Sequence, residues 1–172
     1  MKTFGLLQSR KGEVANDELV RSRSKRSFRI TYRENTCMAD LGLKQAFARF
    51  KADLSNPMWQ VSAIAEDGSL VVSCWTKYLV TEQRVMRYTD RLSRWGNNKP
   101  GNNLLKEHLT VALKTSIPVR LIMAKAENDA DLDEIVDASK IKKTFHVRDD
   151  VVGMVSSFDG DTFVVEFRKP AP

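Results

Sequence analysis

Four arginines follow one another at steps of three, four and three residues in the segment TEQRVMRYTDRLSRW. On an α-helix these steps place all four guanidinium groups on one face. Like charges in one row repel each other by roughly a few tenths of a kcal/mol per pair on a bare helix. The row is therefore expected to face a polyanion or carboxylates of the fold, and the alternative is the solvated face of a surface helix. The arginines are Arg84, Arg87, Arg91 and Arg94.

The next segment, GNNKPGNN, has no helical pattern and predicts a turn-forming loop beside the arginines. It adds the charge of Lys99 and four asparagine amides, which pair with the N6 and N7 atoms of adenine. The asparagines are Asn97, Asn98, Asn102 and Asn103. Aromatic side chains near this segment are candidates for stacking on bases, although a buried Trp75 would only fill the core. These candidates are Trp75, Tyr78 and Trp95.

A second basic segment, RSRSKRSFR, lies near the N-terminus. From residue 25 to residue 33 basic and small polar residues alternate with Phe28, Ile30 and Tyr32, which predicts a strand with one basic and one apolar face. Such a face can follow a phosphate backbone, or it can protect an edge strand from aggregation, and residues 21–26 can instead form a flexible arm. Its cations are Arg21, Arg23, Lys25, Arg26, Arg29 and Arg33.

The charge of the chain is segregated. The 172 residues carry a net charge of +6, but residues 1–126 hold 22 basic and 11 acidic residues, and residues 127–172 hold 6 and 11. A basic region of this length suits a polyanion, most often nucleic acid, and we favour DNA over RNA. An anionic membrane surface, or a basic protein without such a partner, is the alternative.

The sequence offers no catalytic residue, metal site or cofactor motif. Two cysteines and two histidines have no metal-ligand spacing, and His108 is expected to be structural. P-loop, GxGxxG and GxSxG motifs are absent. The residues nearest to a nuclease motif are Asp161, Glu166 and Lys169. The Glu-x-x-Lys spacing, however, places Glu166 and Lys169 on opposite faces of a strand. A magnesium-dependent nuclease of restriction type with a site built from distant acids remains an alternative, as does a protein-interaction module of a mobile element.

The pattern of elements predicts an α/β (α+β) fold with a mixed, largely antiparallel sheet and about three helices. Residues 1–26 are expected to be loosely ordered and residues 27–172 to form a single domain. Predicted helices span residues 38–54, the arginine segment and residues 103–114, the last with Asn102 or Asn103 as N-cap. Predicted strands span residues 59–64 and 70–75, joined by an Asp-Gly turn, then 118–124, 144–147, 151–156 and 162–167. Residues 127–137 are expected to be a solvated acidic helix or loop.

No apolar run approaches the ~18 residues of a membrane span. The apolar start of the chain, residues 4–7, is shorter than the ~7–15 residues of a signal-peptide core. A cytoplasmic protein without a membrane partner is therefore expected.

From residue 94 onward, RWGNNKPGNNLLKEHLTVAL followed by PVRLIMAKA resembles the N-terminal DNA-recognition domain of McrA-type, modification-dependent restriction proteins. The matching residues are Trp95, Gly96, one of Asn102 or Asn103, and the helix leucines, and GMVSSFDGDTFVVEF is similar to the closing hairpin of that domain. The resemblance implies DNA binding, reading of modified bases and a role in bacterial or phage defence. The chain lacks the Asp-Tyr that is common at the helix start in this family, and it lacks an HNH nuclease motif. The resemblance therefore implies a non-catalytic binding module.

Overall fold

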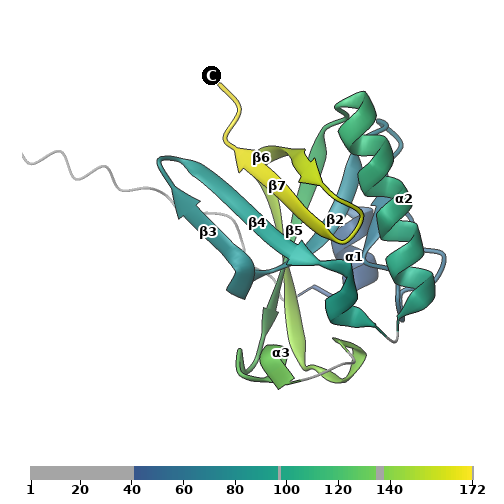
Figure 1. The fold of residues 1–172 in the computed structure, drawn as a ribbon. Coiled ribbons are helices and arrows are strands. Elements are labelled where there is room, and N and C mark those ends of the chain that lie inside the picture. Colours follow the sequence, from purple (N-terminus) through teal and green to yellow (C-terminus); the bar gives the residue numbers. More distant parts are fainter. Residues whose placement is uncertain (1–40, 97, 135–137, 172) are drawn as a thin grey trace, which may run out of the picture. The chain divides into compact units, whose positions relative to one another are not determined.

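A seven-stranded sheet in the order β1-β2-β5-β6-β7-β4-β3 forms the centre of the part of the chain that the structure describes (Figure 1). The computed structural model describes residues 41–96, 98–134 and 138–171. Only the pairing of β2 with β5 is parallel, and the other five neighbouring pairs are antiparallel. The predicted α+β class with a mixed, mostly antiparallel sheet is therefore confirmed. The boundary predicted at residue 26 lies outside the described residues.

The strands are β1 (Ser62–Ile64), β2 (Leu70–Trp75), β3 (Leu79–Glu82), β4 (Val85–Arg91), β5 (Val119–Ala126), β6 (Lys143–Phe158) and β7 (Thr162–Arg168). The helices are α1 (Leu43–Ala48), α2 (Lys99–Thr115) and α3 (Asp131–Glu134), and three short 3₁₀ turns are η1 (Thr76–Tyr78), η2 (Leu92–Trp95) and η3 (Ala138–Lys140). None of the described helices is long and apolar enough to cross a bilayer.

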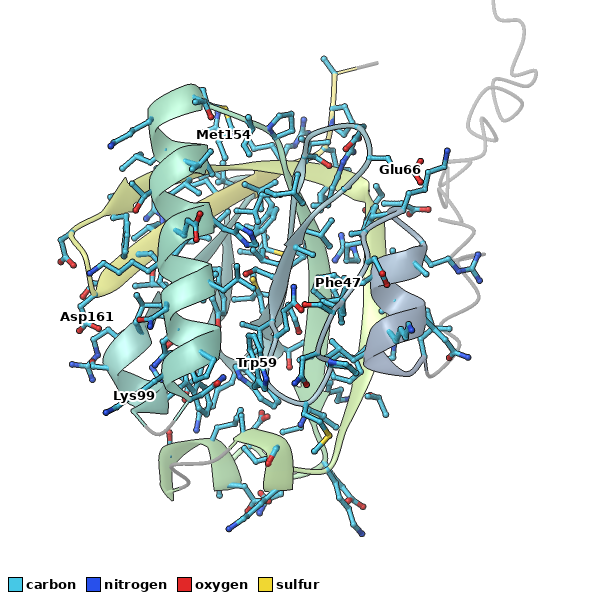
Figure 2. The ribbon with its side chains drawn as sticks, turned by 90° about the vertical axis from the view of Figure 1, so that its right-hand side faces the viewer. Phe47, Trp59, Glu66, Lys99, Met154 and Asp161 are labelled. Atoms are coloured by element: carbon cyan, nitrogen blue, oxygen red, sulfur yellow. The ribbon has the colours of Figure 1, made fainter. Side chains whose placement is uncertain are left out.

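Helices α2 and α1 lie on opposite sides of the central strands (Figure 2). The buried stripe of α2 contains Leu105 and Leu109, and Phe47 of α1 is fully buried. Between the helices, β5 buries Leu121 and Ile122 completely. Each such side chain contributes roughly 1.5–3 kcal/mol when it leaves water, so this layered core stabilises the domain. The prediction of a central apolar strand near residues 118–124 is confirmed.

The Asp-Gly hairpin predicted between residues 64 and 70 is also confirmed, because β1 and β2 pair antiparallel around Gly68, whose φ is +80°. The two strands predicted at 144–147 and 151–156 are in fact one strand, β6. Asp149 and Asp150, which separate the two predicted strands, lie within it. The register of β6 against β5 shifts near these acids, and Arg148 Nε donates to Asp150 Oδ1 at 2.6 Å. This irregularity lets the strand continue through two exposed charges.

The prediction of an arginine-rich helix is wrong. Residues 79–91 form the β3–β4 hairpin, and β4 pairs with β7 along its whole length. Tyr88 and Asp90 are buried, and Arg87 and Arg91 are exposed, so the period of β4 is two. A spacing of four places Arg87 and Arg91 on one face of either a helix or a strand. Pairing with β7 decides for the strand.

Helix α2 begins four residues earlier than expected, so the predicted loop over residues 96–103 and the predicted cap at Asn102 or Asn103 are wrong. Asn98 is the N-cap and accepts a hydrogen bond from Gly101 N at 3.1 Å. Pro100 occupies the first turn, where its missing N–H costs no helical hydrogen bond. A Cβ on Gly101 would lie 2.5 Å from the carbonyl oxygen of Trp59, so only glycine allows the helix to approach that loop. The helix predicted at 38–54 is shorter, since α1 spans only Leu43–Ala48, and Phe47 and Leu54 are buried in the core.

The turn of the β3–β4 hairpin is strained, because Gln83 and Arg84 have φ of +47° and +69°. Two-residue hairpin turns of this kind favour Asn-Gly. Replacing Gln83-Arg84 by Asn-Gly should raise the free energy of unfolding by about 1 kcal/mol, as urea denaturation would show. Arg87→Gly, placed inside β4, should instead lower it. Equal effects of both changes would contradict a strained turn.

Candidate nucleic-acid interface and aromatic cavity

The structure places only part of the predicted nucleic-acid contacts. The cations of the N-terminal segment and one asparagine of the predicted loop lie outside the described residues. These residues are Arg21, Arg23, Lys25, Arg26, Arg29, Arg33 and Asn97.

Three of the four arginines of the row project from the β3–β4 hairpin. Arg84 is exposed at its turn, and Arg87 and Arg91 are exposed on one face of β4. The backbone positions of Arg87 and Arg91 lie about 13 Å apart along the strand, at about 3.3 Å per residue. Arg87 Nη2 lies 2.9 Å from Glu166 Oε1, and this hydrogen bond lowers the pKa of Glu166. Because the Arg87 side chain is 55% exposed, water screens this ion pair and the guanidinium remains accessible to an anion.

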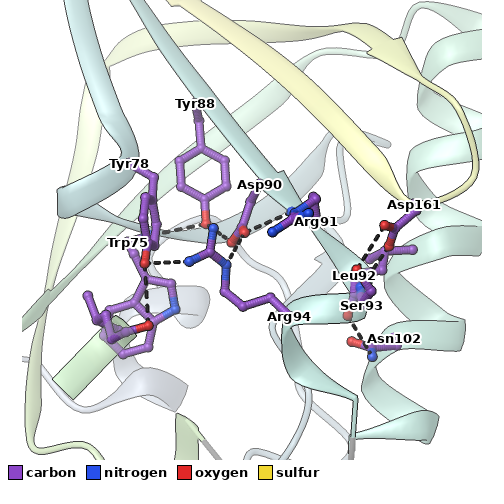
Figure 3. A network of polar contacts seen from close by, with 11 residues as sticks. Trp75, Tyr78, Tyr88, Asp90, Arg91, Leu92, Ser93, Arg94, Asn102 and Asp161 are labelled. Carbon is purple, nitrogen blue, oxygen red and sulfur yellow. Dashed lines mark hydrogen bonds and ion pairs between the residues drawn. The ribbon is translucent and has the colours of Figure 1, made fainter. Parts of the chain in front are cut away.

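Arg94, in contrast, is half-buried in a network of polar contacts around the buried Asp90 (Figure 3). Its Nε donates to Asp90 Oδ1 at 2.6 Å, and its guanidinium lies 4.0 Å above the ring of Tyr78, whose hydroxyl it also contacts. Asp90 further accepts the hydroxyl of Tyr88 at 2.7 Å and the backbone N–H of Arg91 at 2.8 Å. Burial, together with the charge of Asp90, raises the pKa of Tyr88 well above its usual value. The structure thus separates Arg94 from the other arginines and gives it a neutralising role inside the fold.

An aromatic cavity of about 430 Å³ lies where β2, β4 and β5 end and α2 begins. Residue Lys99, which starts α2, and Trp59 lie toward the same end of the domain in Figure 2. All three tryptophans of the chain line the cavity, and the ring centroids of Trp75 and Trp95 are 6.1 Å apart. Its aromatic lining is Trp59, Trp75, Tyr88, Trp95, Phe145 and Phe163, and its polar lining includes Gln60, Ser73, Asp90, Asn98, Asn102, Ser139 and Lys143.

Asparagine side chains hold two of the tryptophans in place. Asn98 Nδ2 donates to the carbonyl oxygen of Trp59 at 2.9 Å. Asn102 Nδ2 donates to the carbonyl oxygens of Trp95 and Leu92, both at 3.0 Å. The amide donors predicted to face base edges are therefore engaged within the protein, whereas Asn103 and Lys99 are exposed.

The turn between β6 and β7 also helps to position Trp95. Asp161 accepts hydrogen bonds from the backbone N–H and the hydroxyl of Ser93, at 2.7 and 2.8 Å. Its carbonyl oxygen also accepts the N–H of Leu92 at 3.0 Å. These bonds anchor η2 and hence the Trp95 ring, so Asp161 has a structural task.

The acids considered for a nuclease site are engaged separately. Asp161 binds η2, Glu166 pairs with Arg87, and Lys169 Nζ lies 3.8 Å from Asp150. Over residues 41–96, 98–134 and 138–171, no three His, Cys, Asp or Glu side chains are grouped to hold a metal ion. His108 Nδ1 lies 2.9 Å from Ser62 Oγ, and burial lowers its pKa, which fits the expected structural role.

Sequence reasoning identified two of the cavity's aromatic residues, Trp75 and Trp95, and missed the rest. A usable signal was present, since all three tryptophans fall within residues 59–95. Comparison with protein families, curated proteins and solved structures finds no match for this chain. The resemblance to McrA-type proteins therefore stays a prediction from the residues that carry it.

Removing Arg94 should destabilise the domain strongly. The side chain of Asp90 is 2% exposed, and Arg94→Ala would leave its charge buried without a cation. We expect the free energy of unfolding to fall by roughly 3 kcal/mol in urea denaturation. The exposed neighbour provides the control, because Arg91→Ala should change it by less than about 0.5 kcal/mol. Equal effects would show that the Asp90 carboxylate does not need Arg94.

Proposed function

We propose that this domain binds nucleic acid, with double-stranded DNA favoured, and does so without catalysis. The observation that supports this most is the row of exposed Arg84, Arg87 and Arg91 on the β3–β4 hairpin. A two-stranded ribbon fits the major groove, which is about 12 Å wide. The hairpin lies at the edge of the sheet, and its turn extends away from the other strands (Figure 1).

Phosphate contacts supply most of the affinity in this proposal. Arg87 and Arg91, about 13 Å apart on one strand face, suit two phosphates that flank a groove. Arg84 at the turn and Lys99 at the start of α2 add exposed charge. The basic segment at residues 21–33 would add further phosphate contacts. Asn103 is exposed beside Lys99 and is the asparagine best placed to meet a base edge. Recognition of a modified base belongs to the same proposal and rests on the family resemblance.

Binding by these cations should depend steeply on salt. Six to eight phosphate contacts predict a slope of roughly −5 to −7 in a plot of log K against log salt concentration. Fluorescence anisotropy with a labelled duplex at several salt concentrations measures this slope. Lack of binding at low salt would overturn the proposal, and cleavage of plasmid with Mg²⁺ would favour the nuclease alternative.

Single arginines separate binding from stability. Arg84→Gly should weaken binding to all duplexes and make the salt slope less steep by about 1, while it stabilises the hairpin turn. Arg87→Ala combined with Arg91→Ala should make the slope less steep by about 2. Lys114→Ala, at the exposed far end of α2, is the matched control and should leave the slope unchanged. If the control made the slope less steep by an equal amount, only the net charge of the protein would matter for binding.

A further inference from the structure

We infer that the aromatic cavity binds a single unstacked nucleobase. This inference rests on the proposed function for the origin of the base, in a nucleic acid, and goes beyond it by assigning a second site. The hairpin arginines would hold the backbone, and the cavity would hold one ring. The size, the walls, the polar groups and the charge of the cavity support this ligand class in turn.

The cavity has the size and the walls of a site for a planar ligand. Its volume of about 430 Å³ falls within the roughly 300–1,000 Å³ of small-molecule sites. Trp75 and Trp95 are tilted by only 30° to one another, and Trp59 and Tyr88 complete an aromatic lining. Flat aromatic walls stack on every base, because each base has a π-face.

The polar groups of the lining suit the edge of a base. A carboxylate accepts about four hydrogen bonds. Asp90 accepts three, from the N–H of Arg91, the Nε of Arg94 and the hydroxyl of Tyr88. One acceptor position therefore remains for an N–H of a ligand. Among the described residues, Asn102 Oδ1 also receives no hydrogen bond, since both bonds of its amide use Nδ2. Nucleobases offer N–H donors on the edge that pairs with another base.

The charge of the cavity argues against a cationic ligand. Aromatic linings also hold quaternary ammonium groups, usually where the site is electron-rich. Here Arg94 already neutralises Asp90, which is the one acid among the described lining residues. A methylated ammonium group would therefore find no carboxylate left to balance its charge. A neutral heterocycle needs no such partner.

Strand β4 connects the two sites. Asp90 faces the cavity, and the next residue, Arg91, is exposed on the opposite face of the strand. A phosphate bound by Arg91 would therefore lie close to the strand end that forms the cavity wall. A base reaches such a site either from a single strand or after rotation out of a duplex.

Intrinsic fluorescence reports on the cavity directly, because the chain has three tryptophans and all of them line it. Titration of the full chain with deoxycytidine and with deoxyadenosine should quench this fluorescence saturably. Deoxyribose 5-phosphate and choline should not. Saturable quenching by choline, or no saturable quenching by either nucleoside, would overturn the inference.

A variant that fills the cavity sharpens the test. Ser73 lines the cavity and is only half-buried, so Ser73→Leu should reduce nucleoside affinity by about tenfold or more through lost stacking space. Trp95→Ala, in the half-buried η2 turn, serves as a second variant if Ser73→Leu does not fold, which a thermal unfolding curve would show. Unchanged nucleoside affinity in a folded variant would overturn the inference.

The arginine variants distinguish this inference from the proposed function. The Arg87→Ala, Arg91→Ala double variant should weaken duplex binding and keep nucleoside quenching. Nucleoside binding without any DNA binding in the parent chain would support the cavity and overturn the proposed function, whereas DNA binding without quenching would do the reverse. Oligonucleotides that contain 2-aminopurine identify the source, because its emission rises on unstacking. A rise with the duplex, lost in Ser73→Leu, indicates base rotation, and a rise only with the single strand indicates single-strand capture.

Discussion

The buried carboxylate of Asp90 is the constraint around which this end of the fold is arranged. An unpaired charge in a protein interior is very costly, so Asp90 requires a cation and hydrogen-bond donors. Arg94 supplies the cation, and Tyr88 and the backbone of Arg91 supply donors. Because these groups come from β4 and η2, neutralising one carboxylate also fixes the path of the chain between strand and helix. Tyr78 beneath the guanidinium of Arg94 extends this arrangement to η1.

The same strand serves two surfaces because its side chains alternate. The inward residues of β4 complete the aromatic cavity, and the outward residues carry the exposed arginines. The two surfaces are therefore one residue apart on the same strand, with Asp90 lining the cavity and Arg91 exposed on the other face.

Local hydrogen bonds explain why Asn98 and Asn102 do not offer their amide N–H groups to a ligand. In sequence, four amides beside a lysine suggest groups that read bases. In the folded chain, Asn98 caps α2 and binds the Trp59 carbonyl, and Asn102 binds two carbonyls of η2. Short amide side chains satisfy nearby backbone groups first, because these partners are already held within reach. The asparagines thus shape the cavity through the tryptophans that they position.

The sequence by itself determined the class of the fold, the apolar strand β5 and the glycine turn at Gly68, because hydrophobic periodicity and turn chemistry are local properties. It did not determine whether Arg84 to Arg94 form a helix, since the spacing of Arg87 and Arg91 fits both periods. The backbone hydrogen bonds between β4 and β7, which are far apart in the chain and place Arg87 opposite Glu166, decided for the strand. The cavity likewise joins Trp59, Trp75 and Phe145, which no local pattern relates, so only the tertiary structure brought them together.

The physical reason is the separation along the chain of the residues that interact. Periodicity along the chain records which side of an element is apolar, and this information survives in any fold that buries that side. Which strands pair, and which side chains meet at the end of a sheet, depends on hydrogen bonds and packing between residues far apart in the chain, and only the folded structure contains those contacts.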